Sequence, residues 1–565
     1  MNETMPATGS KSFGAGAVLT LVFSLFLITT AGLQWARGAY RAEFGGDADE
    51  ATHYVTSLMV RDYLAALMPG PPMQFAKNYY LHYPKVGLGH WPPFFYIVHA
   101  SWTLLFSPSR FSALCLMALL TALLALTLYL VVRDEFSNRA GIAAGLMFIS
   151  LPLVQRFAGM IMAEMLVALL VFAAVLVFAR YLDTERWQDA ALFGLLASAA
   201  ILTKATGLVL AFVPLMSLLL SRRLYLLVRS SLWLPALIVL ALCGPWYLLA
   251  PDANHESVAL AGGISLWGSE ELPVLAILPR LAGWGVLLVI LAGFLVRVVW
   301  PLLKREKIPS RWACAGALVV SFLLFRYLVA EATPFKHLTI VAAPFLMFLA
   351  AGLDLLAPRF PPQRVSERRK ALALAVLTGL VYLYEAFTIP RKRAHGFSQV
   401  ADYLVSKPQL RDSVFLISSN ASGEGSFIAE VAMRERRPGH FVLRASKVLS
   451  HSDWDGNRYK LMHRTRAMIE NYLASVPVGV VVIDWSPQRR LPEHERLLME
   501  TVKANPDRWQ LLTSYQDRLA PDPGATILVY GQAGHETKPP GEIRIDMSRT
   551  LGTVLRFRPQ DAKSK

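Results

Sequence analysis

The sequence predicts an α-helical membrane protein with many spans and a separate C-terminal α/β domain. Three observations predict it: apolar runs of about twenty residues recur through the first 389 of 565 residues, the loops between them alternate in Lys and Arg content, and the composition changes near residue 390. Apolar and aromatic residues make up 54% of the chain and charged residues 17%, against about 25% charged in an average soluble domain. These figures exclude a disordered chain and argue against an ordinary soluble enzyme.

The apolar runs are expected to cross the membrane, because a bilayer core of about 30 Å needs about twenty apolar helical residues. Eleven candidate spans follow: 13–34, 111–132, 140–155, 163–181, 189–203, 206–220, 231–250, 273–299, 312–330, 337–357 and 371–389. The first is expected to be a retained helix, since it has neither a basic start nor a small-residue cleavage site typical of a signal peptide.

The distribution of basic residues predicts the orientation, because Lys and Arg favour cytoplasmic loops. One alternate set of loops holds most of them, at Arg133, Arg139, Arg180, Arg186, Arg222, Arg223, Arg229, Lys304, Arg305, Lys307, Arg311 and the 359–370 segment, whereas residues 251–272 contain none. Much of the net charge of +16 therefore sets topology, and no nucleic-acid partner is expected. The first loop, residues 35–110, and residues 390–565 are placed outside the cytoplasm.

The segment 91–106 is apolar enough to resemble a twelfth span. Counting it would invert every later loop and place the basic clusters outside. Its Trp91, its Pro92-Pro93 pair and its other aromatic residues fit a helix at the membrane surface, or a re-entrant one.

Residues 390–565 are expected to form an extracytoplasmic α/β domain with a mostly parallel sheet and a flexible tail. Strands are predicted at 414–418, 478–484, 509–515 and 525–530, helices near 425–435, 458–475 and 491–504, and a final hairpin at 542–557. Gly423-Glu424-Gly425 does not complete a dinucleotide-binding motif, so a nucleotide site is not favoured. The three cysteines fall in or near the spans, which excludes a disulfide framework in the external parts.

Acidic residues at the outer ends of spans are candidates for function, because charge at membrane depth is costly. Three carboxylates follow the first span within four residues, at Asp47, Asp49 and Glu50. They repel one another unless a cation, a metal or a ligand with hydrogen-bond donors lies among them. The alternative is a helix N-cap at Asp47 or Asp49. Glu164 opens an otherwise apolar span, where the alternative is a helix-end charge that faces headgroups.

Basic candidates lie on the same predicted side. Lys204 occupies the outer turn between two spans, where the alternative is simple snorkelling. Lys336, His337 and Arg326 surround another outer turn and are candidates for binding an anionic headgroup, and His90 precedes Trp91-Pro92-Pro93. Carboxylates and cations that converge on one membrane face suit a reaction on a lipid-linked anionic substrate.

These motifs together resemble the membrane glycosyltransferases of the GT-C fold. The resemblance rests on the Asp49-Glu50 pair after the first span, Pro92-Pro93 before aromatic residues, Glu164 at a span start, the Leu202-Thr203-Lys204 turn and Pro334-Phe335-Lys336. It is nearest to the protein O-mannosyltransferase and aminoarabinose transferase branch, and it covers residues 13–389 in a GT-C-like catalytic domain, 1–389.

The resemblance implies an inverting transfer from a polyprenyl-phosphate-linked sugar outside the cytoplasm, in a bacterial inner membrane. It places the catalytic carboxylate on Asp49 and the second acidic position on Glu164. The basic residue that enters a late helix falls on Lys336. Relatives often have His or Lys directly before the Pro pair, whereas here Trp91 intervenes and His90 stands one place earlier.

The expected chemistry uses Asp49 to orient the acceptor hydroxyl and take its proton. His90, Lys204, Lys336, His337 and Arg326 are the candidates for binding the donor phosphate. Glu164 would orient the acceptor or, with Asp47 and Glu50, hold a divalent cation, although no cofactor is expected. The acceptor is left open as protein, lipid or glycan. The alternatives are a lipid-linked sugar flippase, which should show paired repeats, and a non-catalytic assembly protein.

Overall fold

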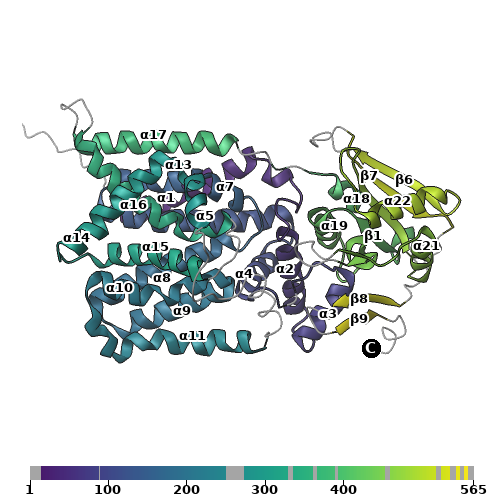
Figure 1. Ribbon diagram of the computed structural model, residues 1–565, viewed down its shortest axis with the longest axis horizontal. Helices are drawn as coiled ribbons and strands as arrows, with labels where there is room; N and C mark the ends of the chain where they lie inside the picture. Colours follow the sequence, from purple (N-terminus) through teal and green to yellow (C-terminus); the bar gives the residue numbers. More distant parts are fainter. Residues whose placement is uncertain are drawn as a thin grey trace, which may run out of the picture.

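The computed structural model describes residues 14–87, 89–249, 273–328, 335–359, 366–388, 392, 394–451, 459–476, 478–516, 524–534, 542–547 and 553–557. A helical body forms one end of an elongated molecule, and a unit containing a β-sheet forms the other (Figure 1). Three helices of the first loop, α2 to α4, lie between the two parts (Figure 1). The candidate site residues belong to the body and to this intermediate layer.

Two inner helices of the helical body, α8 (Glu164–Thr184) and α16 (Thr339–Leu356), are mostly buried by their neighbours. The peripheral helices expose apolar faces, as expected for lipid contact, and α17 runs along one edge while α11 runs along the opposite edge (Figure 1). The other helices of the body are α1 (Ala15–Ala36), α5 (Arg110–Glu135), α6 (Asn138–Ser150), α7 (Pro152–Ala158), α9 (Trp187–Thr203), α10 (Val213–Ser221), α11 (Ser230–Leu249), α13 (Pro273–Phe294), α14 (Trp300–Leu303), α15 (Ser310–Leu328) and α17 (Glu367–Thr388).

Eight described helices are long and apolar enough to cross a membrane, or nine if the bent α6–α7 pair is one span. The sequence predicts eleven. Pro152 ends α6 and starts α7 with a bend of 64°, because proline is incompatible with a helix interior. The predicted spans 189–203 and 206–220 correspond to shorter helices, and the latter begins with a 3₁₀ segment, η2 (Ala205–Ala211).

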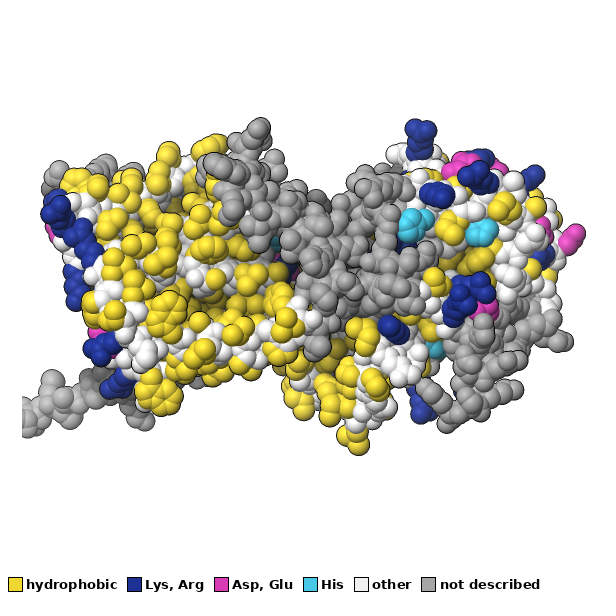
Figure 2. Space-filling view, turned by 60° about the horizontal axis from the view of Figure 1, so that its bottom comes forward, with side chains coloured by type: hydrophobic (Ala, Val, Ile, Leu, Met, Phe, Trp, Pro, Cys, Tyr) yellow, Lys and Arg dark blue, Asp and Glu magenta, His cyan; other side chains and the backbone are white. Residues whose placement is uncertain are grey.

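The Lys- and Arg-rich loops meet at the end of the body farthest from the sheet, which we call the basic end. Arg311 pairs with Asp134 at 3.2 Å, and Arg223 pairs with Asp183 at 3.2 Å. Figure 2 shows Lys and Arg side chains gathered there, next to a broad apolar surface that covers the body. This distribution is typical of a membrane protein whose apolar belt faces lipid.

The first loop folds into η1 (Ala39–Arg41) and helices α2 (Glu50–Ala65), α3 (Pro72–His82) and α4 (Phe94–Leu105). Pro72 occupies the first turn of α3, where its missing N–H costs nothing. α4 has only 12 residues, too few to cross a bilayer, and it packs against α2. α2, with Asp49 at its N-cap, lies between the helical body and the C-terminal unit (Figure 1).

The C-terminal unit contains a five-stranded sheet in the order β2-β1-β5-β7-β6. Its strands are β1 (Val414–Ser418), β2 (Phe441–Arg444), β5 (Val478–Trp485), β6 (Trp509–Gln516) and β7 (Thr526–Gln532). β1 pairs in parallel with β2 and β5, whereas β7 pairs antiparallel with β5 and β6. The expectation of a mostly parallel sheet is therefore wrong for the β5–β7–β6 side, where both strand pairs are antiparallel.

Helices and small ribbons complete this unit. The helices are α18 (Phe397–Val405), α19 (Ala421–Arg434), α20 (Ala445–Val448), α21 (Arg466–Ser475) and α22 (Glu493–Ala504). Two further antiparallel pairs are β3 (Ser450–His451) with β4 (Lys460–Leu461), and β8 (Ile543–Met547) with β9 (Thr553–Phe557). The strands β1 and β5 are almost fully buried, as their continuous apolar runs predict.

Polar contacts attach the C-terminal unit to the first loop. Arg437 Nε donates to Asp62 Oδ2 at 2.7 Å near the end of α2, and Tyr83 donates its hydroxyl to Glu435 at 2.5 Å. Glu43 accepts three backbone N–H groups at the start of the unit, from His395, Gly396 and Ser398. Hydrogen bonds to ionised groups are the stronger class, so these contacts hold the C-terminal unit against the first loop.

Candidate active site

Asp49 lies at the start of α2 and forms an ion pair with Lys336. Lys336 Nζ lies 2.7 Å from Asp49 Oδ2, and both side chains are about one-sixth exposed. Asp49 occupies the N-cap position, but among the described residues its carboxylate makes no capping hydrogen bond. Burial would raise the pKa of Asp49, but the cationic groups around it, led by Lys336, together outweigh burial and lower that pKa, so the carboxylate is ionised. The carboxylate thus faces Lys336 and not its own helix.

Glu164 is the first residue of α8 and pairs with Lys204, which follows α9. Lys204 Nζ lies 2.5 Å from Glu164 Oε1, and the Glu164 side chain is 1% exposed. The second oxygen, Oε2, is buried and has no hydrogen-bond partner among the described residues. A buried carboxylate oxygen without a partner costs free energy, so it is available to a ligand donor.

The two ion pairs are close enough to interact. Asp49 interacts electrostatically with Lys204 as well as Lys336, and Glu164 interacts with Lys336 as well as Lys204. Four segments far apart in the sequence thus supply two carboxylates and two ammonium groups to one place. The sequence predicts Asp49 and Glu164 as the catalytic carboxylates, and Lys204 and Lys336 as two of the five candidates for binding the donor phosphate.

The other acidic candidates hold the first loop. Glu50 is fully buried and pairs with Arg110 at 2.7 Å, while its two oxygens also accept the N–H groups of Gly46 and Ile161. Asp47 Oδ1 accepts the Asp49 N–H at 3.1 Å. Glu50 therefore fixes the start of α2 against α5 and the α7–α8 connection. Within the described residues, no three His, Cys, Asp or Glu side chains are grouped as metal ligands.

The remaining basic candidates surround this centre. His337 is buried and interacts electrostatically with Lys204, Lys336 and Arg326, which is itself buried at the end of α15. His90 is half-buried and contacts Trp91 edge to face at 4.5 Å. Burial lowers the pKa of His90, an effect that the charge of Asp49 opposes.

His53 is a polar residue of the site that the sequence reasoning did not select. It lies one turn after Asp49 on α2, its Nδ1 lies 3.0 Å from the Tyr96 hydroxyl, and its ring stacks obliquely on Trp91 at 4.5 Å. Burial lowers the pKa of His53 to about 4, despite the nearby charges of Asp49 and Glu164. The sequence does hold one indication of this role, because residues four positions apart on a helix lie on the same face, and His53 follows Asp49 by four.

This arrangement suits proton transfer beside an anionic leaving group. Asp49 is an ionised carboxylate that is partly open, whereas Glu164 is the deeper carboxylate with an unpartnered oxygen. Each ammonium has three donors, so a lysine can hold a carboxylate and a phosphate oxygen together. Such contacts are strong in a site that excludes water.

Comparison with known proteins identifies the fold. Residues 90–248 match the family model of dolichyl-phosphate-mannose-protein mannosyltransferase, a segment that includes His90, Glu164 and Lys204. No curated protein sequence matches the chain.

Solved structures extend the likeness beyond that segment. ArnT from Cupriavidus metallidurans, in the apo state, is 15% identical over 92% of this chain and 98% of its own, with a TM-score of 0.57. The same protein bound to undecaprenyl phosphate gives a TM-score of 0.56 at 15% identity over 91% and 98%. The Archaeoglobus fulgidus oligosaccharyltransferase is 14% identical over 84% of this chain and 70% of its own, with a TM-score of 0.54. The chain therefore has the GT-C fold of membrane glycosyltransferases.

Proposed function

We propose that this chain is an inverting glycosyltransferase that moves a sugar from a polyprenyl-phosphate donor to an acceptor hydroxyl or a related nucleophile. The observation that carries the proposal is the convergence of the Asp49–Lys336 and Glu164–Lys204 pairs. The GT-C fold and the mannosyltransferase family match over residues 90–248 support it. The ArnT structure with undecaprenyl phosphate supports a polyprenyl phosphate as the carrier.

In the proposed step, Asp49 orients the acceptor and takes its proton as the new glycosidic bond forms. The bond between the anomeric carbon and the phosphate oxygen breaks on the opposite face, and polyprenyl phosphate leaves with the electron pair. Lys336 and Lys204 then offset the charge that grows on the phosphate. Because attack and departure occur on opposite faces of the sugar, the configuration inverts.

The supporting roles follow from position. Glu164 Oε2 would accept a hydrogen bond from the sugar or acceptor. His337, Arg326 and His90 extend the positive surface available to the donor phosphate. We propose no resident metal, because each of the two carboxylates already faces an ammonium group. The site is proposed to face the outside of a bacterial inner membrane, since the positive-inside rule assigns the basic end to the cytoplasm.

Reconstituted transfer tests this function. Purified protein in liposomes would receive synthetic polyprenyl-phosphate sugars and a panel of protein, lipid and glycan acceptors, and mass spectrometry would detect the glycosylated product. Product that is lost in Asp49→Asn and in Glu164→Gln supports the proposal. Full transfer by both variants would refute the assigned site. Movement of labelled lipid across the bilayer without any product would favour a flippase.

A further inference from the structure

A cavity of about 510 Å³ lies at the basic end of the helical body, and its lining residues include neither Asp49 nor Lys336. It is bounded by the α5–α6 turn, α16, α17 and the short π-helical segment η4 (Leu295–Val299). Its volume lies within the range of small-molecule sites, about 300–1,000 Å³. The proposed transfer chemistry uses none of its lining residues.

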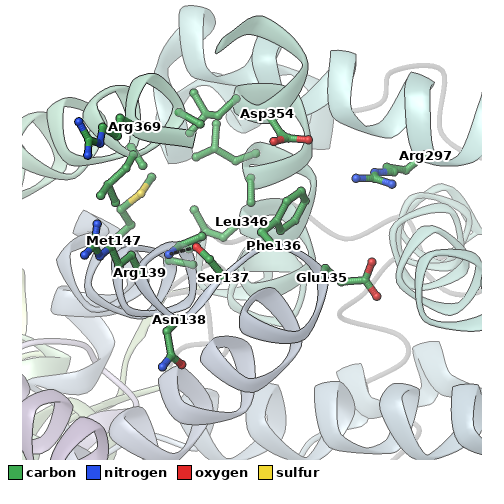
Figure 3. Close-up of a pocket in the computed structure, with 18 residues that line it drawn as sticks. Glu135, Phe136, Ser137, Asn138, Arg139, Met147, Arg297, Leu346, Asp354 and Arg369 are labelled. Carbon is green, nitrogen blue, oxygen red and sulfur yellow. Dashed lines mark hydrogen bonds between the residues drawn. The ribbon is translucent and has the colours of Figure 1, made fainter. Parts of the chain in front are cut away.

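The cavity joins an apolar floor to a charged rim. Met147, Leu346 and Ala375 belong to the floor, and the rim includes three arginines against two carboxylates, namely Arg139, Arg297 and Arg369 with Glu135 and Asp354. Figure 3 shows Arg139 and Arg369 on the same side, with Met147 between them, while Glu135, Asp354 and Arg297 lie on the other side. The positive charge is therefore concentrated on one side of the opening.

The arginines on the two sides differ in their contacts. Arg297 lies over the rings of Phe136 and Trp312, at 5.5 and 5.0 Å, and Glu135 accepts the Trp312 indole N–H. Arg139 and Arg369 are exposed and form no ion pair with any described residue. Two guanidinium groups on one side of the cavity are therefore unpaired with any described carboxylate, and guanidinium matches phosphate geometry.

The floor continues onto a surface that faces lipid. α17 contributes Arg369 and Ala375 to the cavity, and farther along it exposes Leu377, Leu380 and Tyr384. A ligand whose anionic group reaches the arginines would extend an apolar tail along this helix. Basic pockets between membrane helices at the cytoplasmic side are typical sites for anionic lipid headgroups.

We propose that this cavity binds an anionic phospholipid of the leaflet at the basic end, with its phosphate on Arg139 and Arg369 and an acyl chain over the floor beside α17. The combination of charge and apolar surface favours a lipid over a soluble phosphate, for which the apolar floor would contribute nothing. The site stands independently of the proposed glycosyl transfer.

The test uses full-length protein in phosphatidylcholine nanodiscs that contain phosphatidylglycerol, with native mass spectrometry to count the retained phosphatidylglycerol. We expect Arg139→Gln/Arg369→Gln to lose about thirtyfold in affinity, which corresponds to about 1 kcal/mol for each basic residue. Arg186→Gln/Lys307→Gln is the matched control, because it removes two exposed charges from the same end outside the cavity. Equal retention by the two double variants would overturn the proposal.

Filling the floor separates a lipid from a soluble anion. Ala375→Trp should displace phosphatidylglycerol although both arginines remain, whereas Leu237→Trp on the exposed face of α11, along the opposite edge of the body, should not. Glycerol 3-phosphate should compete poorly with the lipid. Competition by glycerol 3-phosphate at equal concentration, or full lipid retention by Ala375→Trp, would refute a phospholipid site.

Discussion

Replacing Asp49 by Asn should separate catalysis from donor binding. The substitution keeps the size of the side chain and an oxygen that can accept from Lys336, but it removes the negative charge now 2.7 Å from Nζ. Loss of a general base typically lowers kcat by about 10²- to 10⁴-fold. Since Asp49 is only 16% exposed, water cannot easily replace it, and we expect about 10³-fold, or about 4 kcal/mol in the barrier.

The donor KM should not rise in the same variant. Lys336 loses its carboxylate partner and keeps its full charge for the donor phosphate, so KM should stay constant or fall. The assay is initial-rate transfer from a synthetic polyprenyl-phosphate sugar, with kcat and KM measured separately. Asp47→Asn is the matched control, because its oxygen can still accept the Asp49 N–H, and it should change kcat by no more than about twofold. A kcat for Asp49→Asn within tenfold of wild type would contradict the role of Asp49.

The remaining predictions concern charge. The transfer rate should stay constant until the pH falls below about 4, because Lys336 holds the pKa of Asp49 below its ordinary value of about 3.9. Lys336→Met should move the acidic fall of the kcat profile to higher pH. If that fall does not move, Asp49 is not the group that causes it. Lys204→Met should destabilise the protein by about 3–5 kcal/mol, because it leaves the buried Glu164 carboxylate without its cation, and Glu164→Gln/Lys204→Met should recover most of this in denaturant unfolding. A double variant no more stable than the single one would contradict that account. Burial lowers the pKa of Lys85 to about 7 from 10.5, so the unfolded chain binds more protons between these values and stability should rise with pH across that range. Lys85→Met should flatten this rise, as unfolding measured across pH 7–10 would show.

Much of the helical body was predictable because a membrane span is a local property of the sequence. The α5 and α8 helices match their apolar runs within a few residues. The sequence predicts more spans than the structure has long apolar helices among its described residues, because some apolar runs are interrupted. In 140–155, for example, Pro152 bends the chain, so hydropathy alone does not show that the run is a single straight helix. The antiparallel pairing of β5 with β7 escaped prediction for a different reason, because α22 and β6 separate these strands in the sequence and only the fold brings them together.

The four central residues of the site were predictable from their chemistry and their side of the membrane. Their pairing was not, because Asp49 and Lys336 are 287 positions apart. The role of Glu50 also depends on distance, since only the fold brings Arg110 to it. His53 is harder to single out, because a histidine within a helix is more often a packed side chain than a ligand, and its partner Tyr96 lies on another helix.

α2 is held at both ends, so it connects the C-terminal unit mechanically to the candidate active site. At one end stands Asp49, and near the other Asp62 is held by Arg437 of the C-terminal unit. The 16 residues of α2 span about 24 Å of rigid helix. A displacement of the C-terminal unit would therefore move α2 and with it the Asp49 carboxylate. Truncation near residue 390 would remove the contact between Arg437 and Asp62. A shortened chain should therefore lose the position of Asp49 beside Lys336, although every residue of the proposed centre is still present.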